Sequence, residues 1–328
     1  MYNNKEQIRF IDLFCGIGGF RIAFEEACKE LDVNASCVFS SDIDSSCQDS
    51  YEANFGERPH GDITQVDEKQ VPDHDILFAG FPCQPFSIIG RMKGLDDIRG
   101  TLFFDVARII KEKKPKAFIL ENVKQLVGHD KGNTLKVILK ALEDLGYHVK
   151  YKVLNALDHG LPQKRERVVI VGHQDPIMFT YPDPIKYYKP LTDILDSKVD
   201  KKYYASEYIR LKRKESHDSS FHPSIWHENK SGNISSYPFS CALRAGASYN
   251  YLLVNGERRL TPREMFRLQG FPDWYKIVVG DGQARKQAGN AVPVNMIRSV
   301  AQKLIPYLGT SLDQATVLQE HELKYNAI

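Results

Sequence analysis

The sequence lacks any apolar run that approaches the roughly 18 residues needed to cross a bilayer. Its opening stretch, MYNNKEQIRF, is polar and has no apolar core of the kind found in signal peptides. With 22 Gly and 16 Pro among 328 residues, the chain also lacks a collagen-like or disordered bias. We therefore expect a cytoplasmic globular protein with no membrane partner, large enough for one large domain or two smaller ones.

The cysteine patterns that define zinc sites and disulfide scaffolds are absent as well. The six cysteines include no CxxC pair, and no spacing of Cys with His matches a zinc site, so we expect no bound metal. Disulfides are rare in cytosolic proteins. A lone cysteine is usually a small buried apolar residue, and we expect this of Cys15, Cys28, Cys37, Cys47 and Cys241.

Charge is nearly balanced over the whole chain, at +2, but it is unevenly distributed. Residues 1–150 contain 19 Lys/Arg against 24 Asp/Glu, a balance of −5, whereas residues 151–328 contain 25 against 18, a balance of +7. A basic second half suits a polyanionic partner such as a nucleic acid. A solvated basic face would give the same counts, and charge alone does not separate the two.

The first half of the chain alternates between strand and helix patterns. Apolar runs predict buried strands at residues 8–14, 37–42, 75–80 and 117–122. Helical spacing predicts helices at residues 20–31, 45–54, 101–112 and 133–145. The runs YHVKYKVLNA and RVVIVGH predict a hairpin, because too few residues separate them for a crossover helix. This alternation predicts an α/β fold with a doubly wound, mostly parallel sheet.

After His173 the pattern becomes irregular. Residues from about 175 to 255 are rich in Tyr, Pro, Ser, Lys and Asn and show little periodicity. Regularity returns at residues 260–273, where Thr261 is placed to cap a helix and Pro262 to occupy its first position. A last helix is expected after Pro293.

The first predicted strand runs into a glycine-rich turn, DLFCGIGGF, at residues 12–20. Glycines at this point of a doubly wound sheet let a ligand approach the backbone closely. Gly16 and Gly18 fit the first two positions of the dinucleotide pattern GxGxxG, but Arg21 occupies the third, which argues against NAD. Asp42, at the end of the second strand, is placed to bind the ribose of an adenosine-containing cofactor. Taken alone, the turn fits a nucleoside site and a purely structural role equally well.

The segment FPCQPFS, residues 81–87, directly follows the strand predicted at residues 75–80. Pro82 and Pro85 stiffen the backbone on either side of Cys83, which helps to position a reactive group. A loop between two prolines at the end of a strand is not a core environment. Cys83 is therefore the candidate nucleophile.

A carboxyl group and two arginines are expected beside this cysteine. Glu121 ends the next predicted strand, so adjacent strands would bring it near Cys83. Burial should raise the pKa of this carboxyl, which suits a proton donor, although a structural carboxylate that caps a helix is the alternative. QKRER, residues 163–167, adds Arg165 and Arg167, which either face the same site or belong to a solvated turn.

Together these motifs resemble those of the DNA cytosine-5 methyltransferases of bacterial restriction–modification systems. The resemblance covers nearly the whole chain and rests on DLFCGIGG, FPCQPFS, ENV, QKRER, RLTPREMFRLQGFPD and GNAVPVN, in the family's order and spacing. It implies a Rossmann-like fold that uses S-adenosyl-L-methionine to modify double-stranded DNA. It also implies a monomer that is functionally paired with a restriction endonuclease.

The resemblance assigns catalytic roles to four residues. Cys83 would attack C6 of the target cytosine, and Glu121 would bind the N3/N4 edge of the base. Arg165 and Arg167 would contact the base oxygen and help to hold Glu121. Because a base inside a duplex cannot reach a cysteine, the cytosine would be flipped out of the stack.

The resemblance also divides the chain and suggests DNA contacts. Residues 1–174 would form the catalytic and cofactor-binding domain, residues 175–255 a smaller target-recognition domain, and residues 256–328 a segment that returns to the catalytic domain. Residues 87–100 would be a mobile loop that closes over the DNA. The DNA-binding residues expected from this scheme are Ser87, Arg99 and Arg244.

The cofactor site is implied by the same family pattern. Asp42 would bind the ribose hydroxyls, Ile43 would lie against the adenine, and Asp62 would bind the adenine amino group. The complete set of expected cofactor-binding residues is Phe14, Gly16, Gly18, Gly19, Asp42, Ile43, Asp62, Ile63, Pro82, Asn290 and Val292.

Several alternatives remain to be weighed against this assignment. Related RNA cytosine-5 methyltransferases carry a Cys-Phe-Thr motif near the recognition region, whereas this chain has SCALRAG there, at residues 240–246. A catalytically silent DNA-binding relative would be expected to lack Cys83 or Glu121, and both are present. The basic run RLKRK, residues 210–214, is interpreted as a solvated run rather than a phosphate contact.

Overall fold

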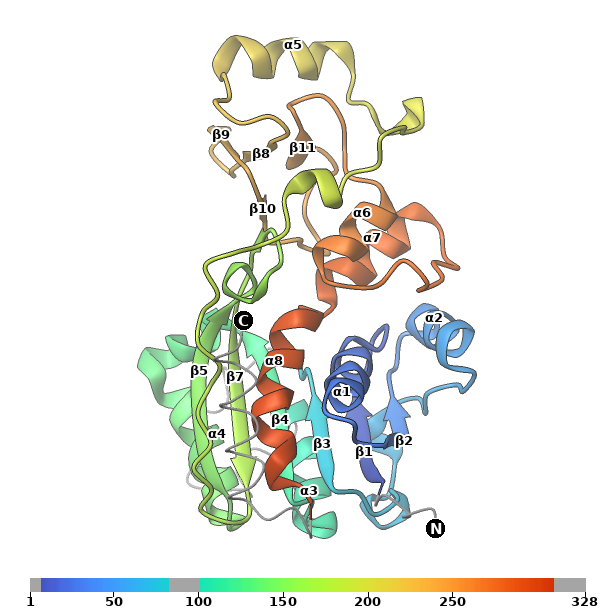
Figure 1. Cartoon of the computed structure of the whole chain (residues 1–328), viewed down its shortest axis with the longest axis vertical. Coiled ribbons are helices and arrows are strands. Elements are labelled where there is room, and N and C mark those ends of the chain that lie inside the picture. Colours follow the sequence, from blue (N-terminus) through green and yellow to red (C-terminus); the bar gives the residue numbers. More distant parts are fainter. Residues whose placement is uncertain (1–6, 83–100, 310–328) are drawn as a thin grey trace.

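The computed structural model describes residues 7–82 and 101–309, so Cys83, Ser87 and Arg99 lie outside the described residues. The lower lobe in Figure 1 is built on a six-stranded sheet with the order β2-β1-β3-β4-β7-β5. Its strands are β1 (Ile8–Leu13), β2 (Ala35–Ser41), β3 (Ile76–Ala79), β4 (Ala117–Val123), β5 (His148–Asn155) and β7 (Glu166–His173). Strands β1 to β4 are parallel, and β7 is antiparallel to β4 and β5. The predicted parallel sheet with a closing hairpin is therefore confirmed.

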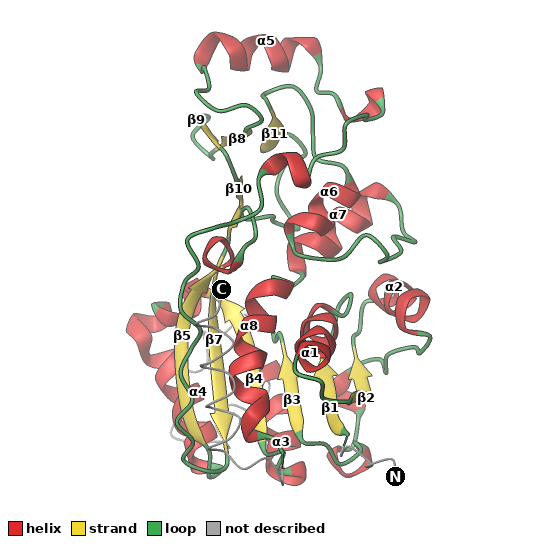
Figure 2. Ribbon diagram, in the orientation of Figure 1, coloured by secondary structure: helices red, strands yellow, loops and turns green. Residues whose placement is uncertain are grey.

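Helices cover both faces of this sheet (Figure 2). The helices α1 (Gly19–Glu30) and α8 (Val294–Leu304) pack on one face, and α3 (Leu102–Lys113) and α4 (Asn133–Asp144) pack on the other. Alternate residues of β1 separate the two sides, since Phe10 belongs to the α1 side and Ile11 to the α3 side. Burial on both faces explains why the central strands β1, β3 and β4 are mostly apolar.

The upper lobe in Figure 1 contains more regular structure than the sequence predicted. It has helix α5 (Glu207–Ser216) and a three-stranded antiparallel sheet of β8 (Ile225–Glu228), β9 (Ile234–Tyr237) and β11 (Leu252–Val254). These strands have three or four residues, too few for a detectable alternation. A two-residue pairing of β10 (Ser240–Cys241) with β6 (Gln163–Lys164) joins the lobes.

The interpretation of RLKRK as a solvated run is wrong for Arg213. This side chain is only 3% exposed and forms an ion pair with Glu228 at 2.6 Å, with a further hydrogen bond to the carbonyl of Asn250. Helix α5 turns one residue of the run inward, and the carboxylate compensates the cost of burying its charge. Lys214 remains exposed but pairs with Glu257.

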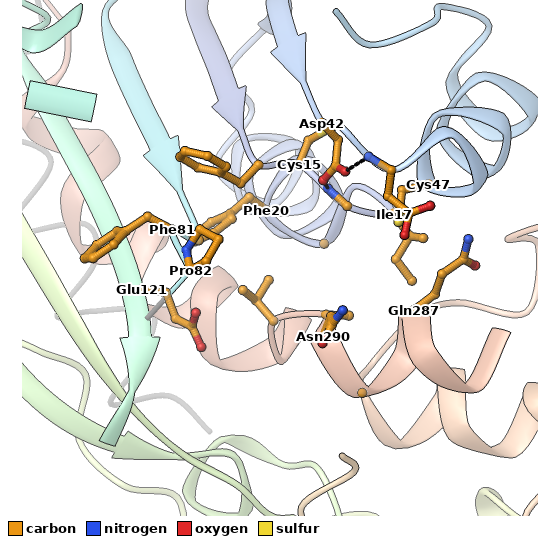
Figure 3. A pocket seen from close by; sticks show the side chains of 18 of the residues that line it. Cys15, Ile17, Phe20, Asp42, Cys47, Phe81, Pro82, Glu121, Gln287 and Asn290 are labelled. Atoms are coloured by element: carbon orange, nitrogen blue, oxygen red, sulfur yellow. Dashed lines mark hydrogen bonds between the residues drawn. The ribbon is translucent and has the colours of Figure 1, made fainter. Parts of the chain in front are cut away.

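The carboxyl ends of the four parallel strands share one edge, as a doubly wound sheet requires. Asp42 follows β2, Phe81 follows β3, and Glu121 lies near the end of β4 (Figure 3). Helix α2 (Ser45–Phe55) begins beside Asp42, capped by Asp44, whose side chain accepts a hydrogen bond from the Ser46 N–H. Residues from distant parts of the sequence therefore meet at this edge.

The segment after the upper lobe begins as predicted. Thr261 caps α6 (Pro262–Leu268), Pro262 is its first residue, and Glu264 completes a reciprocal capping box with Thr261. Pro293 precedes α8 as expected. Helix α7 (Asp281–Asn290) was not predicted, because its sequence, DGQARKQAGN, has little apolar periodicity.

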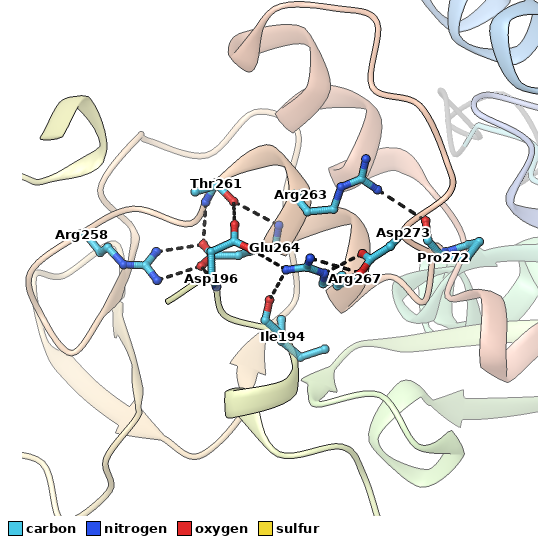
Figure 4. Close-up of polar contacts among 9 residues, drawn as sticks. All are labelled: Ile194, Asp196, Arg258, Thr261, Arg263, Glu264, Arg267, Pro272 and Asp273. Carbon is cyan, nitrogen blue, oxygen red and sulfur yellow. Dashed lines mark hydrogen bonds and ion pairs between the residues drawn. The ribbon is translucent and has the colours of Figure 1, made fainter. Parts of the chain in front are cut away.

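Glu264 is also the centre of a polar cluster that ties α6 to the start of the upper lobe (Figure 4). Its carboxylate is fully buried and makes a bidentate contact with Arg258, at 2.9 and 2.8 Å. The same carboxylate accepts the backbone N–H of Asp196 at 2.8 Å, and Asp196 pairs with Arg267 at 2.7 Å. Both oxygens of the buried Glu264 carboxylate thus accept hydrogen bonds, which a buried charge requires.

Among the described residues, no helix is both long and apolar enough to span a membrane.

We expect Glu264→Ala to lower the free energy of unfolding by about 3–5 kcal/mol, because it leaves the Arg258 guanidinium buried without a counter-charge. Urea denaturation of the purified protein measures this change. The matched control is Asp273→Ala, which removes a largely exposed partner of Arg267 and should cost no more than about 1 kcal/mol. Equal effects of the two substitutions would contradict the central role of Glu264.

Candidate active site

A cavity of about 590 Å³ lies at the carboxyl edge of the sheet (Figure 3). This volume is within the range typical of ligand sites. The candidate residues that line it are Phe14, Gly16, Gly19, Asp42, Ile43, Asp62, Ile63, Pro82, Glu121, Arg165, Arg167, Arg244, Asn290 and Val292. One continuous cavity therefore joins the expected cofactor site to the expected catalytic carboxyl group.

Two groups of candidates do not line the cavity in the described part of the chain. Cys83, Ser87 and Arg99 lie outside the described residues, although Pro82, directly before Cys83, is a lining residue. Gly18 lies in the turn but is not a lining residue. It has a φ of 80°, and a side chain there would overlap the ring of Phe55, so its position serves packing.

The glycine turn orients Asp42. Phe14 and Gly16 both have a left-handed backbone, with φ of 55° and 54°. This turns the Gly16 N–H toward Asp42, whose carboxylate accepts it at 2.8 Å and accepts the Asp44 N–H at 2.8 Å. Burial raises the pKa of Asp42, and these two N–H groups oppose the rise. A left-handed residue with a side chain as large as Phe14 costs about 1–2 kcal/mol, which is typical of functional turns.

Glu121 lies at the other end of the cavity, in contact with Arg167. Their Oε1 and Nε atoms are 2.8 Å apart, and both side chains are almost fully buried. Strand pairing explains the contact, because β4 and β7 are neighbours and Arg167 lies opposite Val123. Burial raises the pKa of Glu121, while Arg167 and Arg165 oppose the rise. The raised pKa agrees with the sequence-based expectation and favours a carboxyl that can hold a proton.

The carboxyl of Glu121 also faces the start of the cysteine loop. Gly80 has no side chain, and a Cβ added there would lie 3.8 Å from Glu121 Oε2. The Glu121 carboxyl therefore lies close to the backbone of this turn. Asn122 donates a hydrogen bond to the Phe81 carbonyl at 2.8 Å and holds the chain two residues before Cys83. Asn122 was not singled out from the sequence, although it stands within the ENV motif.

Arg165 does not pair with Glu121 but holds the backbone around the cavity. Its guanidinium donates to the carbonyls of Leu243, Gly289 and Ala291 at 2.8, 2.9 and 2.9 Å. The side chain is only 1% exposed, so the alternative of a solvated turn is wrong for this residue. Burial and the neighbouring Arg167 lower the pKa of Arg165.

Two glutamines that were not predicted as site residues from the sequence also support the site. Gln163, the first residue of QKRER, donates to the Leu268 carbonyl at 2.8 Å and accepts the Leu243 N–H at 3.0 Å. Gln287 lines the cavity from α7 and donates to the Ser46 carbonyl at 2.9 Å. The motif itself marked Gln163, whereas no sequence signal marked Gln287.

The cysteines in the described part of the chain are poor nucleophiles. Cys15, Cys28 and Cys47 are buried, and Cys37 and Cys241 are partly buried. Burial raises the pKa of Cys28, Cys37 and Cys47 to about 12, and it also raises the pKa of Cys15 and of Cys241. Since the thiolate is the reactive form, these thiols behave as the small apolar residues predicted from the sequence.

Solved structures share this fold. The S. pombe Dnmt2 methyltransferase matches with a TM-score of 0.70 at 20% identity, over 92% of this chain and 99% of that one. The Entamoeba histolytica methyltransferase EhMeth matches with a TM-score of 0.68 at 20% identity, over 92% and 98% of the two chains. The chain therefore shares the fold of these two proteins over nearly its whole length.

Sequence comparison then identifies the family. Residues 8–306 match the family described as C-5 cytosine-specific DNA methylase. The type II methyltransferase M.HaeII of Haemophilus aegyptius is 54% identical, over 95% of this chain and 96% of that protein. M.HhaI of Haemophilus parahaemolyticus is 42% identical, over 93% and 95%. The chain belongs to the C-5 cytosine-specific DNA methylases and is a type II, S-adenosylmethionine-dependent DNA (cytosine-5)-methyltransferase.

The raised pKa of Glu121 predicts a pH-dependent effect of Glu121→Gln on stability. A folded-state pKa above the unfolded value means that ionised Glu121 destabilises the fold, and this cost grows as the pH rises through the folded-state pKa. We expect the melting temperature of Glu121→Gln, relative to the wild type, to increase as the pH rises from the ordinary glutamate value of 4.5 through the raised folded-state pKa.

Glu68→Gln supplies a control of opposite sign. The pKa of Glu68 is lowered by hydrogen bonds from its own backbone and from Arg108, so its ionised form stabilises the fold. Relative to the wild type, Glu68→Gln should lose stability as the pH rises. A pH-independent difference for Glu121→Gln, measured by calorimetry, would contradict the assigned shift.

Proposed function

We propose that this enzyme flips a cytosine out of double-stranded DNA, attacks its C6 atom with Cys83 and methylates C5. The observation that carries the proposal is the single cavity that extends from Asp42 to the buried pair of Glu121 and Arg167. Pro82, the residue before Cys83, borders the same cavity. A donor bound near Asp42 and a base bound near Glu121 would therefore meet.

The chemistry follows from the weak nucleophilicity of cytosine C5. The Cys83 thiolate adds to C6 while Glu121 gives its proton to N3, which makes C5 electron-rich as an enamine carbon. When bound, S-adenosylmethionine supplies the methyl group, as C5 displaces the sulfonium sulfur. A base then takes the C5 proton, the C6–sulfur bond breaks, and N3 loses its extra proton. Arg167 holds Glu121 in place, and Arg165 fixes the backbone around the pocket.

The cofactor would lie along the glycine turn, where the cavity offers complementary groups. The oriented carboxylate of Asp42 suits two ribose hydroxyls. Asp62 uses Oδ1 to accept from Thr64, so we assign Oδ2 to the adenine amino group. Ile43 is 74% exposed, an unusual state for an isoleucine that adenine would relieve. The remaining proposed contacts are Phe14, Gly16, Gly19, Ile63, Pro82, Asn290 and Val292.

Residues 175–255, which include α5 and the sheet of β8, β9 and β11, would read the DNA sequence, because the catalytic groups lie outside this segment. Ser87 and Arg99, which follow Cys83 in the sequence, and Arg244, at the cavity wall, would contact DNA. We further propose that the enzyme acts as a cytoplasmic monomer alongside a restriction endonuclease. The type II methyltransferases of bacteria that it resembles support this context.

We expect Asp42→Ala to weaken S-adenosylmethionine binding by about 1–3 kcal/mol, the scale of a lost charge-assisted hydrogen-bond pair. Isothermal calorimetry on the purified protein measures it. Asp67→Ala is the control, because it removes the same charge from an exposed cap outside the cavity and should not change the affinity. Binding of NADH in place of S-adenosylmethionine would refute the cofactor assignment.

Covalent catalysis can be trapped with 5-fluorocytosine, because fluorine at C5 cannot leave as a proton does. An amplified duplex with 5-fluorocytosine at every cytosine should form a denaturation-resistant complex with the enzyme when S-adenosylmethionine is present. Cys83→Ser should abolish the complex, and Glu121→Gln should slow it by about 10²–10⁴-fold.

Cys241→Ser is the matched control, since it alters a thiol that the mechanism does not use, and trapping should persist. The complex is resolved by denaturing electrophoresis and its attachment site by peptide mapping. A cross-link that survives in Cys83→Ser and maps to another residue would overturn the mechanism.

A further inference from the structure

The wall of the cavity on the side of the upper lobe is a loop, residues 242–249, that is fixed from two directions. On one side, Gln163 and Arg165 bind the N–H and carbonyl of Leu243. On the other, the loop lies against α7 so closely that a Cβ on Gly289 would be 2.8 Å from the Arg244 carbonyl carbon. The loop therefore has a defined position relative to the base-binding end of the cavity.

Three arginines gather around two tyrosines at this loop. Arg244 lies over the ring of Tyr251 at 4.8 Å, and Arg285 of α7 lies over the ring of Tyr249 at 4.6 Å. Arg259, which follows the turn after β11, lies 5.8 Å from the ring of Tyr249, and Arg285 also lies 5.8 Å from the ring of Tyr251. Stacking on the rings orders the guanidinium planes before any ligand arrives.

Within residues 7–82 and 101–309 these arginines bind mostly backbone carbonyls, and the carboxylate that interacts with Arg259, that of Asp281, is also paired with Lys202. Arg285 donates to the carbonyls of Ala247 and Ser248, and Arg259 donates to those of Lys202 and Tyr203. None of the three forms an ion pair with a carboxylate among those residues, unlike Arg108, Arg213 and Arg267. Like charges held this close repel one another, so an anionic ligand would stabilise the arrangement.

The shape of the cluster indicates what kind of anion it can take. The hollow between the side chains encloses only about 10 Å³, which excludes a small molecule bound within it. Tyr249 is 59% exposed and Arg244 is exposed, so the ligand would lie across the surface. Arg244 also lines the large cavity, so this surface adjoins the place of the flipped base.

We propose that Arg244, Arg259 and Arg285, ordered by Tyr249 and Tyr251, form a cradle for the DNA phosphates beside the target cytosine. The inference rests on the proposed function, since it requires that the cytosine enter the cavity from a duplex. Each guanidinium has five N–H donors, and the carbonyl contacts use only some of them. A run of phosphates matches several clustered cations better than one base edge does.

The test is the salt dependence of DNA binding by the full-length protein, measured by fluorescence anisotropy with a labelled duplex of random sequence. Each phosphate contact contributes about 0.9 to the slope of log K against log salt. We expect Arg244→Ala, Arg259→Ala and Arg285→Ala each to reduce the slope by about that amount. Affinity at low salt should fall roughly tenfold in each case.

Arg298→Ala is the matched control, because this arginine pairs with Glu26 and Glu30 at the surface between α8 and α1. Its slope should equal that of the wild type. Arg285→Lys tests the positive charge apart from the contacts of the guanidinium with the loop. Lysine keeps the charge but has no planar group to stack on Tyr249. The slope should therefore recover in this variant.

Three results would overturn the cradle. The first is an equal slope in Arg285→Ala and Arg298→Ala, and the second is a loss in Arg285→Ala that Arg285→Lys does not restore. The third is a wild-type slope in Arg244→Ala and Arg259→Ala, which would mean that these two side chains contact no phosphate. Methyl incorporation into DNA by the wild type is measured in parallel. It tests the proposed function, whereas the slopes test the phosphate contacts.

Discussion

The arrangement of the whole site depends on one buried guanidinium. Arg165 lies between β6 and β7 and donates hydrogen bonds to the carbonyls of Leu243, Gly289 and Ala291. These belong to the upper lobe, to the end of α7 and to the turn before α8, so one side chain gathers three separate segments. Both terminal nitrogens of the guanidinium are used in these bonds, whereas its buried Nε has no partner in the structure. Because a buried cation is costly unless its donors are used, removing one of these carbonyl partners would raise that cost.

Around that junction, the site maintains states that would be unfavourable elsewhere in a protein. Burial raises the pKa of Glu121, and the neighbouring Arg167 opposes this rise. Phe14 adopts a left-handed backbone, and Ile43 is exposed. Each of these costs folding free energy, which the two packed faces of the sheet supply. Such local costs are expected where ligands later provide the missing contacts.

Much of the fold follows from the sequence because its signals are local. The runs at residues 8–14 and 117–122 are mostly apolar, as strands buried on both faces are. The capping box at Thr261 is visible in the sequence because its two partners are three residues apart. By contrast, the strands β8, β9 and β11 are too short to show an alternating pattern. Helix α7 consists mostly of polar residues, and polar contacts such as that of Gln287 with Ser46 hold it in place. Neither feature leaves a periodic pattern.

The sequence by itself determined the identity of the chemical groups: a cysteine between prolines, a carboxyl at a strand end and the two arginines of QKRER. Only the tertiary structure decided their partners, because these depend on residues that lie from 46 positions (Glu121 and Arg167) to 126 positions (Arg165 and Ala291) apart. It gave Arg167 to Glu121 but directed Arg165 to backbone carbonyls, although both come from one motif. It also placed Arg285 beside Tyr249, which no pattern in the chain relates. Motifs encode residue types, whereas burial and strand register determine which group each one meets.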